Sequence, residues 1–393
     1  MRRTAMLWEV FVTRFEEVWT QYRKRRLTGE EAGQMLGMSG RNFRRLGVRY
    51  EEDKVEGLRD GRLGRPSPRR APERELERMT QLYRDRYGDL NVSHFHEKLR
   101  EHHNYRLGYT LTRLTLQKAG LVAKWGRRGK HRTKRERRPL RGMLLFQDGS
   151  PHRWIAGFER DLDLIVTLDD ATGEIYSAFL VEQEGTLSSF RGLAETIAAN
   201  GLFGALYTDR GSHYFHTPKL GGPVDKTRLT QVGRALAQLG ITHIPSYSPE
   251  GRGRMERVFG TLQGRLPQEL RLAKITTIAA ANRYLKEHFV PAYNKRFAVP
   301  ATEPGSAFVP YTGAPLAEVL CIQEQRRVGR DNCVLWARRS LQIPPQIHRH
   351  HYVKAIVRVH QYPAGGFAIF DGPRCLARFN HQGEPIDVLP MAA

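Results

Sequence analysis

The sequence predicts a multidomain protein: all-α helix-turn-helix modules first, an α/β domain with a mixed sheet in the middle, and a small all-β barrel last. Three observations predict this order. Two short helical patterns lie in the basic N-terminal part, strands and helices alternate from residue 142 to 275, and short strands with glycine turns follow residue 313. A chain of 393 residues is long enough for more than one domain.

The net charge is the strongest global signal in the sequence. It amounts to +23, and residues 1–140 hold 35 Lys and Arg against 18 Asp and Glu, a net of +17. A field of this sign attracts polyanions, so nucleic acid is the expected partner. A merely soluble basic protein, or one of ribosomal type, is the alternative interpretation.

Composition also excludes several classes of protein. The three cysteines, Cys321, Cys333 and Cys375, are far apart and lack a CxxC spacing, which argues against a disulfide framework or a cysteine zinc site and fits a reducing compartment. No apolar run reaches the length of about 18 residues that a membrane helix needs. Glu9 and Arg14 interrupt the N-terminus too early for a secretory signal. A cytoplasmic, nucleoid-associated protein is therefore expected.

The first helical pattern lies in a predicted DNA-binding helix-turn-helix domain at residues 1–55. Thr28 is expected to cap a short helix with an apolar face at Ala32, Met35 and Leu36. Gly37 to Ser39 should form the turn, and the next helix should bury Phe43 and Leu46. The residues predicted to contact DNA from that helix are Arg41, Asn42, Arg44, Arg45 and Arg49. A helical hairpin that binds nothing is the alternative.

A basic linker at 56–72, which includes Arg65, leads to a second predicted helix-turn-helix domain at 73–121. The linker either follows a phosphate backbone or is a plain tether. In the second domain, Ser93 is expected to cap one helix and Gly120 to end another. The buried positions of this last helix are predicted as Leu111, Leu114 and Leu116, and its DNA contacts as Arg113 and Lys118.

Residues 122–141 form a second basic linker. The segment contains ten Lys and Arg but only one acid, Glu136. It therefore cannot pack on itself and is expected to be disordered without a polyanion. A solvated stretch without function is the alternative. The phosphate contacts predicted here are Lys124, Arg127, Arg128 and Lys130.

The middle of the chain alternates between strand and helix patterns. Strands are predicted at 143–148, 163–170, 174–181, 204–209 and 241–245, and helices at 187–199, 226–239 and 251–270. This succession predicts a mixed sheet covered by helices. A helical connector is expected at 276–312 and the C-terminal barrel at 313–393.

Three acids lie at the predicted ends of strands or at the start of a helix in this sheet domain. Asp148 closes the first strand, Asp209 closes the fourth, and Glu256 lies in the first turns of the helix at 251–270. Carboxylates brought together raise each other's pKa, and a divalent cation resolves this conflict. Mg²⁺ prefers a few carboxylates and accepts phosphate oxygens, and two such ions can clamp a phosphoryl displacement.

Positive side chains lie beside these acids, and Arg252, Arg254 and Arg257 are the predicted DNA contacts among them. Taken singly, each acid is more often a cap or a solvated residue. Together with the basic modules, the acids predict phosphodiester chemistry on DNA.

At these residues the chain resembles the integrase core of DDE transposases, and of ISNCY-type bacterial insertion-sequence enzymes in particular. The resemblance rests on FQDGS, LDDATGEIYSAFL, YTDRGS, IPSYSPEGRGRMERVFGTLQ and FVPAYNKRF, and it extends over the linker EGLRDGRLGRPS and most of the chain. It implies an RNase H-like, retroviral-integrase-like fold and an integrase catalytic core at 142–275. It implies Asp148, Asp209 and Glu256 as the catalytic and metal-binding residues.

The spacing of the third acid leaves a competitor. Asp209 follows Asp148 by 61 residues, and Glu256 follows Asp209 by 47, which is longer than usual in the wider integrase group. The excess falls in 216–227, expected to be a loop insertion. Glu250 is therefore the alternative to Glu256.

The resemblance implies a transposase that cuts and joins double-stranded DNA with Mg²⁺ or Mn²⁺, using two ions. Water cuts the end of the element, and the freed 3′-hydroxyl attacks target DNA. The N-terminal modules would bind terminal inverted repeats in a homodimer or larger synaptic assembly. A non-catalytic sequence-specific DNA-binding protein and another RNase H-fold nuclease are the rival interpretations.

Overall fold

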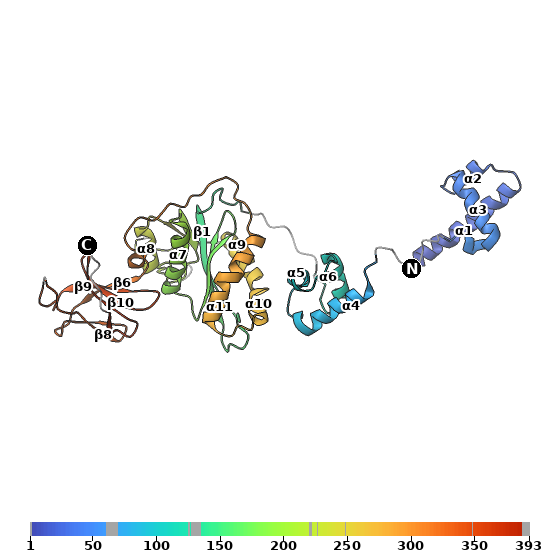
Figure 1. Ribbon diagram of the computed structural model, residues 1–393. Helices are drawn as coiled ribbons and strands as arrows, with labels where there is room; N and C mark the ends of the chain where they lie inside the picture. Colours follow the sequence, from blue (N-terminus) through green and yellow to red (C-terminus); the bar gives the residue numbers. More distant parts are fainter. Residues whose placement is uncertain are drawn as a thin grey trace. The chain divides into compact units, whose positions relative to one another are not determined.

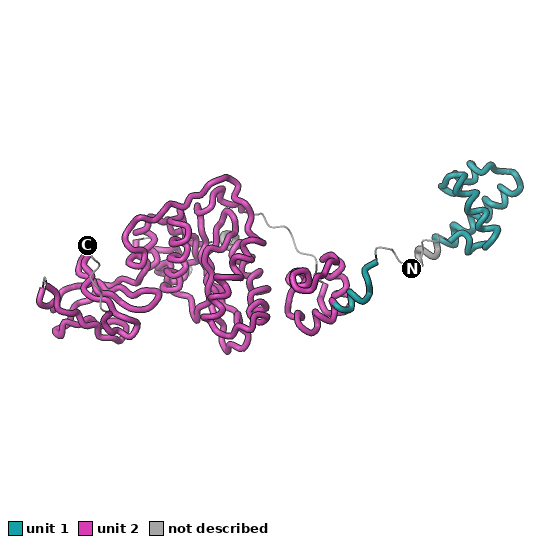
Figure 2. The backbone as a smooth tube through the Cα atoms, viewed as in Figure 1, with its two compact units in different colours: residues 1–78 teal, residues 79–393 magenta. Residues whose placement is uncertain are grey.

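The computed structural model describes residues 2–59, 70–124, 126, 135–219, 222–225, 227–247, 249–347 and 349–386, and the side chains of all these except 2–6 and 249–252. The chain divides into two compact units, residues 1–78 and 79–393 (Figure 2). Within the described part, none of the helices is both long and apolar enough to cross a membrane.

Unit 1 is a cluster of helices around aromatic side chains. It contains α1 (Arg2–Arg23), α2 (Gly29–Met35), α3 (Gly40–Gly57) and the first turns of α4 (Glu73–Leu82) (Figure 1). Phe15 of α1 and Phe43 of α3 are fully buried, with ring centroids 5.7 Å apart. Helix α1 lies within the domain predicted at 1–55, but the helical pattern identified there in the sequence begins only at residue 27. It packs closely on α3, because a Cβ atom on Gly47 would lie only 1.9 Å from the Trp19 ring.

The helix ends expected in unit 1 are confirmed. The Thr28 side chain accepts a hydrogen bond from the Glu31 amide, and Ser39 accepts one from the Asn42 amide. Gly37 lies between the helices with a φ of 69°, a conformation that glycine adopts without strain. Met35 is 53% exposed, so the prediction that it belongs to the apolar face is wrong.

The first part of unit 2 is also helical. After the π-helix η1 (Tyr83–Tyr87) come α5 (Val92–His102) and α6 (Tyr109–Lys118). Asn91, not Ser93, caps α5 by accepting a hydrogen bond from the His94 amide. Leu116 is fully buried as expected, whereas Leu114 is 50% exposed, because the helix turns Thr112 and Leu116 inward instead.

A five-stranded mixed sheet forms the centre of unit 2. Its strands are β1 (Leu144–His152), β2 (Leu162–Asp169), β3 (Ile175–Val181), β4 (Ala205–Thr208) and β5 (Thr242–Pro245), in the order β3-β2-β1-β4-β5. β2 is antiparallel to both β1 and β3, whereas β4 is parallel to β1 and β5. β1, β3, β4 and β5 therefore all point the same way, and their carboxyl ends meet at one edge of the sheet.

Helices cover both faces of this sheet (Figure 1). On one face lie α7 (Thr186–Asn200) and α8 (Gln231–Gln238), packed in a core that includes Leu145. On the other lie α9 (Pro249–Gln263), α10 (Leu266–Leu272), α11 (Ile278–Tyr284), η2 (Leu285–Phe289) and α12 (Val290–Phe297), in a core that includes Phe146. Successive residues of β1 thus serve opposite faces, as the pleat of a strand requires.

The single helix predicted at 251–270 is wrong. The chain breaks it into α9 and α10 between Gln263 and Leu266. Gly264 has a low helix propensity, and Pro267 fits only the first turn of a new helix, where its missing N–H is not needed.

The C-terminal part of unit 2 is an open antiparallel sheet. It follows the short helix α13 (Leu316–Val319) and consists of β6 (Ile322–Arg327), β9 (Ile356–Gln361), β10 (Phe367–Asp371), β11 (Arg374–Phe379) and β12 (Pro385–Ile386), with a hairpin of β7 (Cys333–Trp336) and β8 (Arg339–Gln342). The order is β12-β11-β10-β9-β6, and the two outer strands do not pair with each other. The predicted all-β character is present, but the expected closed barrel is not.

A buried polar network ties α13 to this sheet. The carboxylate of Glu318 accepts hydrogen bonds from Tyr362 and Arg378 and lies 2.7 Å from His360 Nδ1. Burial acts to raise the pKa of Glu318, but these partners outweigh it and lower the pKa to about 2. Glu318, His360 and Cys321 each offer an atom of the kind that binds metal ions, and these three atoms lie within 4.8 Å of one another. Because Arg378 already neutralises Glu318, we assign this group a structural role.

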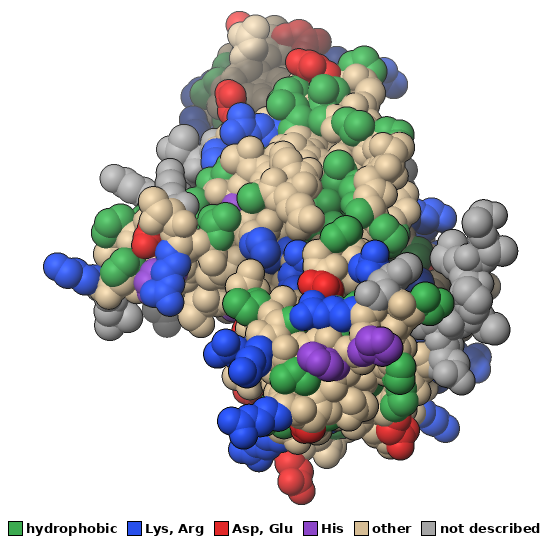
Figure 3. Space-filling view, turned by 90° about the vertical axis from the view of Figure 1, so that its left-hand side faces the viewer, with side chains coloured by type: hydrophobic (Ala, Val, Ile, Leu, Met, Phe, Trp, Pro, Cys, Tyr) green, Lys and Arg blue, Asp and Glu red, His purple; other side chains and the backbone are tan. Residues whose placement is uncertain are grey.

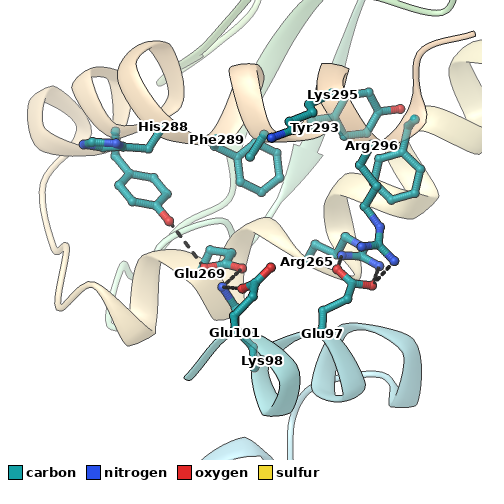
Figure 4. Close-up of a pocket in the computed structure, with 13 residues that line it drawn as sticks. Glu97, Lys98, Glu101, Arg265, Glu269, His288, Phe289, Tyr293, Lys295 and Arg296 are labelled. Atoms are coloured by element: carbon teal, nitrogen blue, oxygen red, sulfur yellow. Dashed lines mark hydrogen bonds and ion pairs between the residues drawn. The ribbon is translucent and has the colours of Figure 1, made fainter. Parts of the chain in front are cut away.

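Helix α5 docks on α10 through charged side chains (Figure 4). Arg265 pairs with Glu97, Arg271 pairs with Asp89, and both His94 and Lys98 contact Glu269. Asn91 adds a hydrogen bond to the carbonyl oxygen of Gly264. A cavity of about 560 Å³ lies beside this contact, between α5 and the helices α10 to α12.

Candidate active site

Asp148 lies within β1, and Asp209 directly follows β4, the neighbouring parallel strand. The pairing of β1 with β4 runs from Leu144 opposite Ala205 to Phe146 opposite Tyr207. Asp148 and Asp209 each lie two residues beyond this last pair, and Tyr214 is close enough to feel the charge of both carboxylates. The sheet thus brings together two carboxylates that are far apart in the sequence.

Backbone amides hold each aspartate. The amide of Gly149 donates to Oδ1 of Asp148 at 3.1 Å, and the amide of Gly211 donates to Oδ1 of Asp209 at 2.9 Å. Asp148 is buried, with 7% of its surface exposed, whereas Asp209 is half-buried. Both carboxylates are therefore oriented by backbone amides one or two residues further along the chain.

Helix α9 covers the sheet face to which Asp148 belongs. Phe146, Asp148 and Ser150 alternate along β1 and so share one face, and Phe146 lies in the core that contains the buried residues of α9. Gln263, at the end of α9, donates a hydrogen bond to Ser150 Oγ at 3.1 Å. The helix that carries the third predicted acid therefore runs along β1.

Glu256 is exposed on α9, next to buried Met255. It precedes Gln263 by seven residues, and at about 100° per residue the two side chains leave the helix within about 20° of each other. Glu256 therefore projects on the side of α9 that meets β1 at Ser150. The side chain of the competitor Glu250 lies outside the described residues.

The two aspartates suit a hard divalent cation. They offer carboxylate oxygens, the ligands that Mg²⁺ prefers, and their mutual repulsion is relieved by a positive ion. Glycines follow or flank both acids, at positions 149 and 211, so no side chain of these residues fills the adjacent space. The donor chemistry thus fits a magnesium or manganese ion.

Three further polar residues at this edge escaped the sequence analysis: Glu184, His213 and Tyr214. Glu184 Oε1 lies 3.5 Å from His213 Nε2 and 3.5 Å from the Tyr214 hydroxyl. Burial is the main cause that raises the pKa of Tyr214 well above its usual value, and nearby carboxylates add to it. These carboxylates belong to Glu184, Asp148 and Asp209. Glu184 could have been identified from its position in the sequence, because it follows β3, whose carboxyl end lies at the same edge of the sheet.

The predicted DNA contacts are spread over both units. Arg41, Arg44 and Arg45 are exposed on α3, and Asn42 and Arg49 are partly exposed there. Arg113, Lys118, Lys124 and Arg257 are exposed in unit 2. Arg65, Arg127, Arg128, Lys130 and the side chain of Arg252 lie outside the described residues. Figure 3 shows Lys and Arg side chains recurring over the face formed by the C-terminal strands.

Arg254 differs from these residues, because it is already paired. Its guanidinium contacts the fully buried carboxylate of Asp170, which Arg135 also contacts. Arg137 donates to the carbonyl oxygen of Asp170. Residues 135–141 of the second basic linker are thus anchored on the sheet domain, and the expectation of disorder is wrong for them.

Comparisons with known proteins show the family to which the chain belongs. The chain is 33% identical over 351 residues to a protein of Sinorhizobium fredii described as transposase y4bF, covering 86% of this chain and 74% of that one. It is 29% identical over 298 residues to the transposase for insertion sequence IS1202 of Streptococcus pneumoniae, covering 67% and 63%. No protein-family model matches the chain.

Two solved structures show a distant likeness. One is a chain of the intasome of simian T-cell lymphotropic virus in complex with a PP2A regulatory subunit, with a TM-score of 0.34 and 16% identity over 80% of this chain and 100% of that one. The other is the HTLV-2 integrase catalytic core domain in complex with magnesium, with a TM-score of 0.28 and 14% identity over 38% and 88%.

Because these relatives are transposases, the chain is an enzyme of DNA transposition and integration, a polynucleotidyl transferase. The chain belongs to the transposases of insertion sequences, of the DDE type.

Proposed function

We propose that this transposase cuts and joins DNA at a centre formed by Asp148, Asp209 and Glu256. The parallel pairing of β1 with β4 is the observation that supports the proposal, because Asp148 and Asp209 each lie two residues beyond its last pair, Phe146 with Tyr207. Glu256 is preferred to Glu250 because it lies on a helix that packs along β1. Ligands held on regular elements are positioned more accurately than those on loops.

The three carboxylates would hold two Mg²⁺ or Mn²⁺ ions, which supply a clamp for the attacking and leaving oxygens of an in-line displacement. The amides of Gly149 and Gly211 keep the aspartates in place, so their oxygens are oriented before DNA arrives. No covalent intermediate on the protein is required. Water cuts the phosphodiester at the end of the element, and the 3′-hydroxyl that this frees then attacks the target strand.

The basic helices would bind the DNA. The exposed arginines of α3 and the cations of α6 are spaced to reach phosphates and base edges, so residues 1–55 and 73–121 act as helix-turn-helix modules on the terminal inverted repeats. Residues 56–72 and 122–141 serve as basic linkers, and 142–275 as the catalytic core. The helical connector spans 276–312 and the C-terminal β domain 313–393. Arg254 takes no part in DNA contact in this proposal, because Asp170 engages it.

Two ends must be held together before they are joined, so the working form is a homodimer or a larger assembly on the inverted repeats and the target DNA. Because its substrate is DNA, we expect the protein to act in the cytoplasm, at the nucleoid.

The test is strand cleavage and strand transfer on DNA that carries the element's ends. Asp148→Asn and Asp209→Asn keep the shape of the side chain and remove its charge. Each is expected to abolish both reactions while end binding stays close to that of the wild type. Cleavage at the wild-type rate in Mg²⁺ by either variant would refute the proposal.

A further inference from the structure

Asp170 is a fully buried carboxylate directly after β2, and helix α9 reaches it through the side chain of Arg254. The guanidinium of Arg254 contacts Asp170 Oδ1, and its Nη1 atom also donates to the backbone carbonyl oxygen of Asp170 at 3.1 Å. The Arg254 side chain is only 13% exposed. A charge-assisted contact that is shielded from water fixes the direction of the two groups as well as their distance.

The end of the second basic linker closes over this pair. The guanidinium of Arg135 contacts the same carboxylate oxygen as Arg254 does, and the amide of Arg138 donates to Asp170 Oδ2 at 2.7 Å. Arg254 Nη2 in turn donates to the carbonyl oxygen of Arg135 at 2.7 Å. Both oxygens of Asp170 are therefore engaged, and the linker and α9 are joined to each other as well as to this carboxylate.

Helix α9 is attached to the sheet by polar contacts near each end. Arg254 contacts Asp170 near its start, and Gln263 donates to Ser150 Oγ at its end. Between these points the helix packs through apolar side chains, whose attraction has no preferred direction. Gly253 adds no packing, because a Cβ atom there would meet no described atom within 4 Å. The contact of Arg254 with Asp170 therefore sets how the start of the helix is placed on the sheet.

Glu256 is close enough to Arg254 to follow any movement of this attachment. It lies two residues further on, which is about 3 Å along the helix axis at a rise of about 1.5 Å per residue. A shift or rotation of the start of α9 is therefore passed on to Glu256 almost undiminished. Misplacement of a catalytic group by about 1 Å can cost about 100-fold in rate.

We propose that Asp170 is a positioning residue for the reaction: by holding Arg254 it fixes the start of α9 and, through the helix, the carboxylate of Glu256. The inference rests on the proposed function, which assigns Glu256 to the catalytic centre. Asp170 acts only through Arg254 and contacts no reacting atom. Because the end of the linker binds the same carboxylate, the docked residues 135–138 are part of this support.

The test measures strand cleavage by the full-length variants Arg254→Gln and Asp170→Asn on DNA that carries the element's ends. Each is expected to lower kcat about 10- to 100-fold, as the loss of a group that orients a catalytic residue does. KM for the DNA ends should stay close to the wild-type value, because the exposed cations that bind DNA are unchanged. Arg254→Lys keeps the charge and should recover part of the loss in kcat.

Arg234→Gln is the matched control, because Arg234 is a half-buried arginine on α8, against the other face of the sheet. It donates to the backbone carbonyl oxygens of Val319 and Cys321, at 3.1 and 2.6 Å. Its loss should lower the melting temperature and leave kcat unchanged. Wild-type kcat in Arg254→Gln, or an equal fall of kcat in both variants, would overturn the inference. If Asp170→Asn does not fold, Arg254→Gln decides alone.

Hydrogen exchange measures the same effect without DNA or metal. The amides of residues 255–258, in the first turns of α9, should exchange faster in Arg254→Gln than in the wild type, because the start of the helix opens more easily. The amides of β3 should exchange as in the wild type. A lower kcat with unchanged exchange in α9 would show that Arg254 acts by another route, and the inference would be wrong.

Glu256→Gln separates this inference from the proposed function. If Glu256→Gln is inactive while Arg254→Gln cleaves as the wild type does, the inference is overturned and the assignment of Glu256 stands. If Glu256→Gln cleaves as the wild type does, the assignment of Glu256 itself fails, whatever the result for Arg254→Gln.

Discussion

Arg265, the N-cap residue of α10, donates hydrogen bonds to both carboxylate oxygens of Glu97 on α5, at 2.7 and 2.8 Å (Figure 4). The two side chains are only 11% and 13% exposed, and Arg296 adds a contact to Glu97 at 2.5 Å. Burial acts to raise the pKa of Glu97, but the two guanidinium groups outweigh it and lower the pKa on balance. A buried, bidentate ion pair thus links the second helical module to the sheet domain.

Replacing Arg265 by Met should loosen α5 from α10. Arg265→Met removes two charge-assisted hydrogen bonds and leaves Glu97 with Arg296 as its cationic partner, at a cost of about 2 kcal/mol. Native-state hydrogen exchange of the α5 amides measures the free energy of opening, which should fall by this order. The double variant Glu97→Gln, Arg265→Met should recover part of the loss. Arg153→Gln is the control, since the Arg153–Asp161 pair is exposed, and α5 amides that exchange equally in R153Q and R265M would contradict the prediction.

Acid should weaken the same contact through Glu269. Burial acts to raise the pKa of Glu269, but hydrogen bonds from His94 and Lys98 outweigh it and lower the pKa to about 2, below the ordinary 4.5. A lowered folded-state pKa gives stability that is fully present above pH 4.5 and is lost as the pH falls toward 2. The opening free energy of α5 should therefore decline across this window. In Glu269→Gln the decline should be shallower, and an identical pH profile in both proteins would be incompatible with this account.

The identity of the third acid can be decided by a pair of variants. Glu256→Gln is expected to abolish strand cleavage, because Glu256 projects on the side of α9 that meets β1. Glu250→Gln should cleave at a rate within a few-fold of the wild type. End binding by both variants is the control for folding. Loss of cleavage in Glu250→Gln with activity kept in Glu256→Gln would reverse the assignment.

Binding of the full chain to the element's ends should depend steeply on salt. Each phosphate neutralised on duplex DNA contributes about −0.9 to the slope of log K against log salt. Exposed Arg44 and Arg45 lie on α3, and replacing both by Gln should make the slope less negative by about 2 if each contacts one phosphate. Arg153→Gln, on the sheet domain, should leave the slope unchanged. A slope in the double variant equal to that of the wild type would place the DNA elsewhere.

Local features of the structure could be predicted from the sequence. The caps at Thr28 and Ser39 and the turn at Gly37 follow from side chains that act on amides three residues away. The strands β1 to β5 follow from apolar patterns that match the period of a strand. Asp209 was recognisable because it directly follows such a strand, whereas Asp148, predicted to close the first strand, lies inside β1, which continues to His152. In all these cases the deciding interaction lies within a few residues of the chain.

Longer-range features were decided only by the tertiary structure. The exposure of Leu114 depends on which side of α6 the rest of the module covers, and the break at Gly264 allows α10 to meet α5. Glu184 lies beside Gly149 and His213 because β3, which it follows, is parallel to β1, so that their carboxyl ends share an edge. The sequence determined which residues could form strands, helices and carboxylate ligands. Their neighbours were set by strand register and by the burial of two apolar cores, which depend on many distant residues at once.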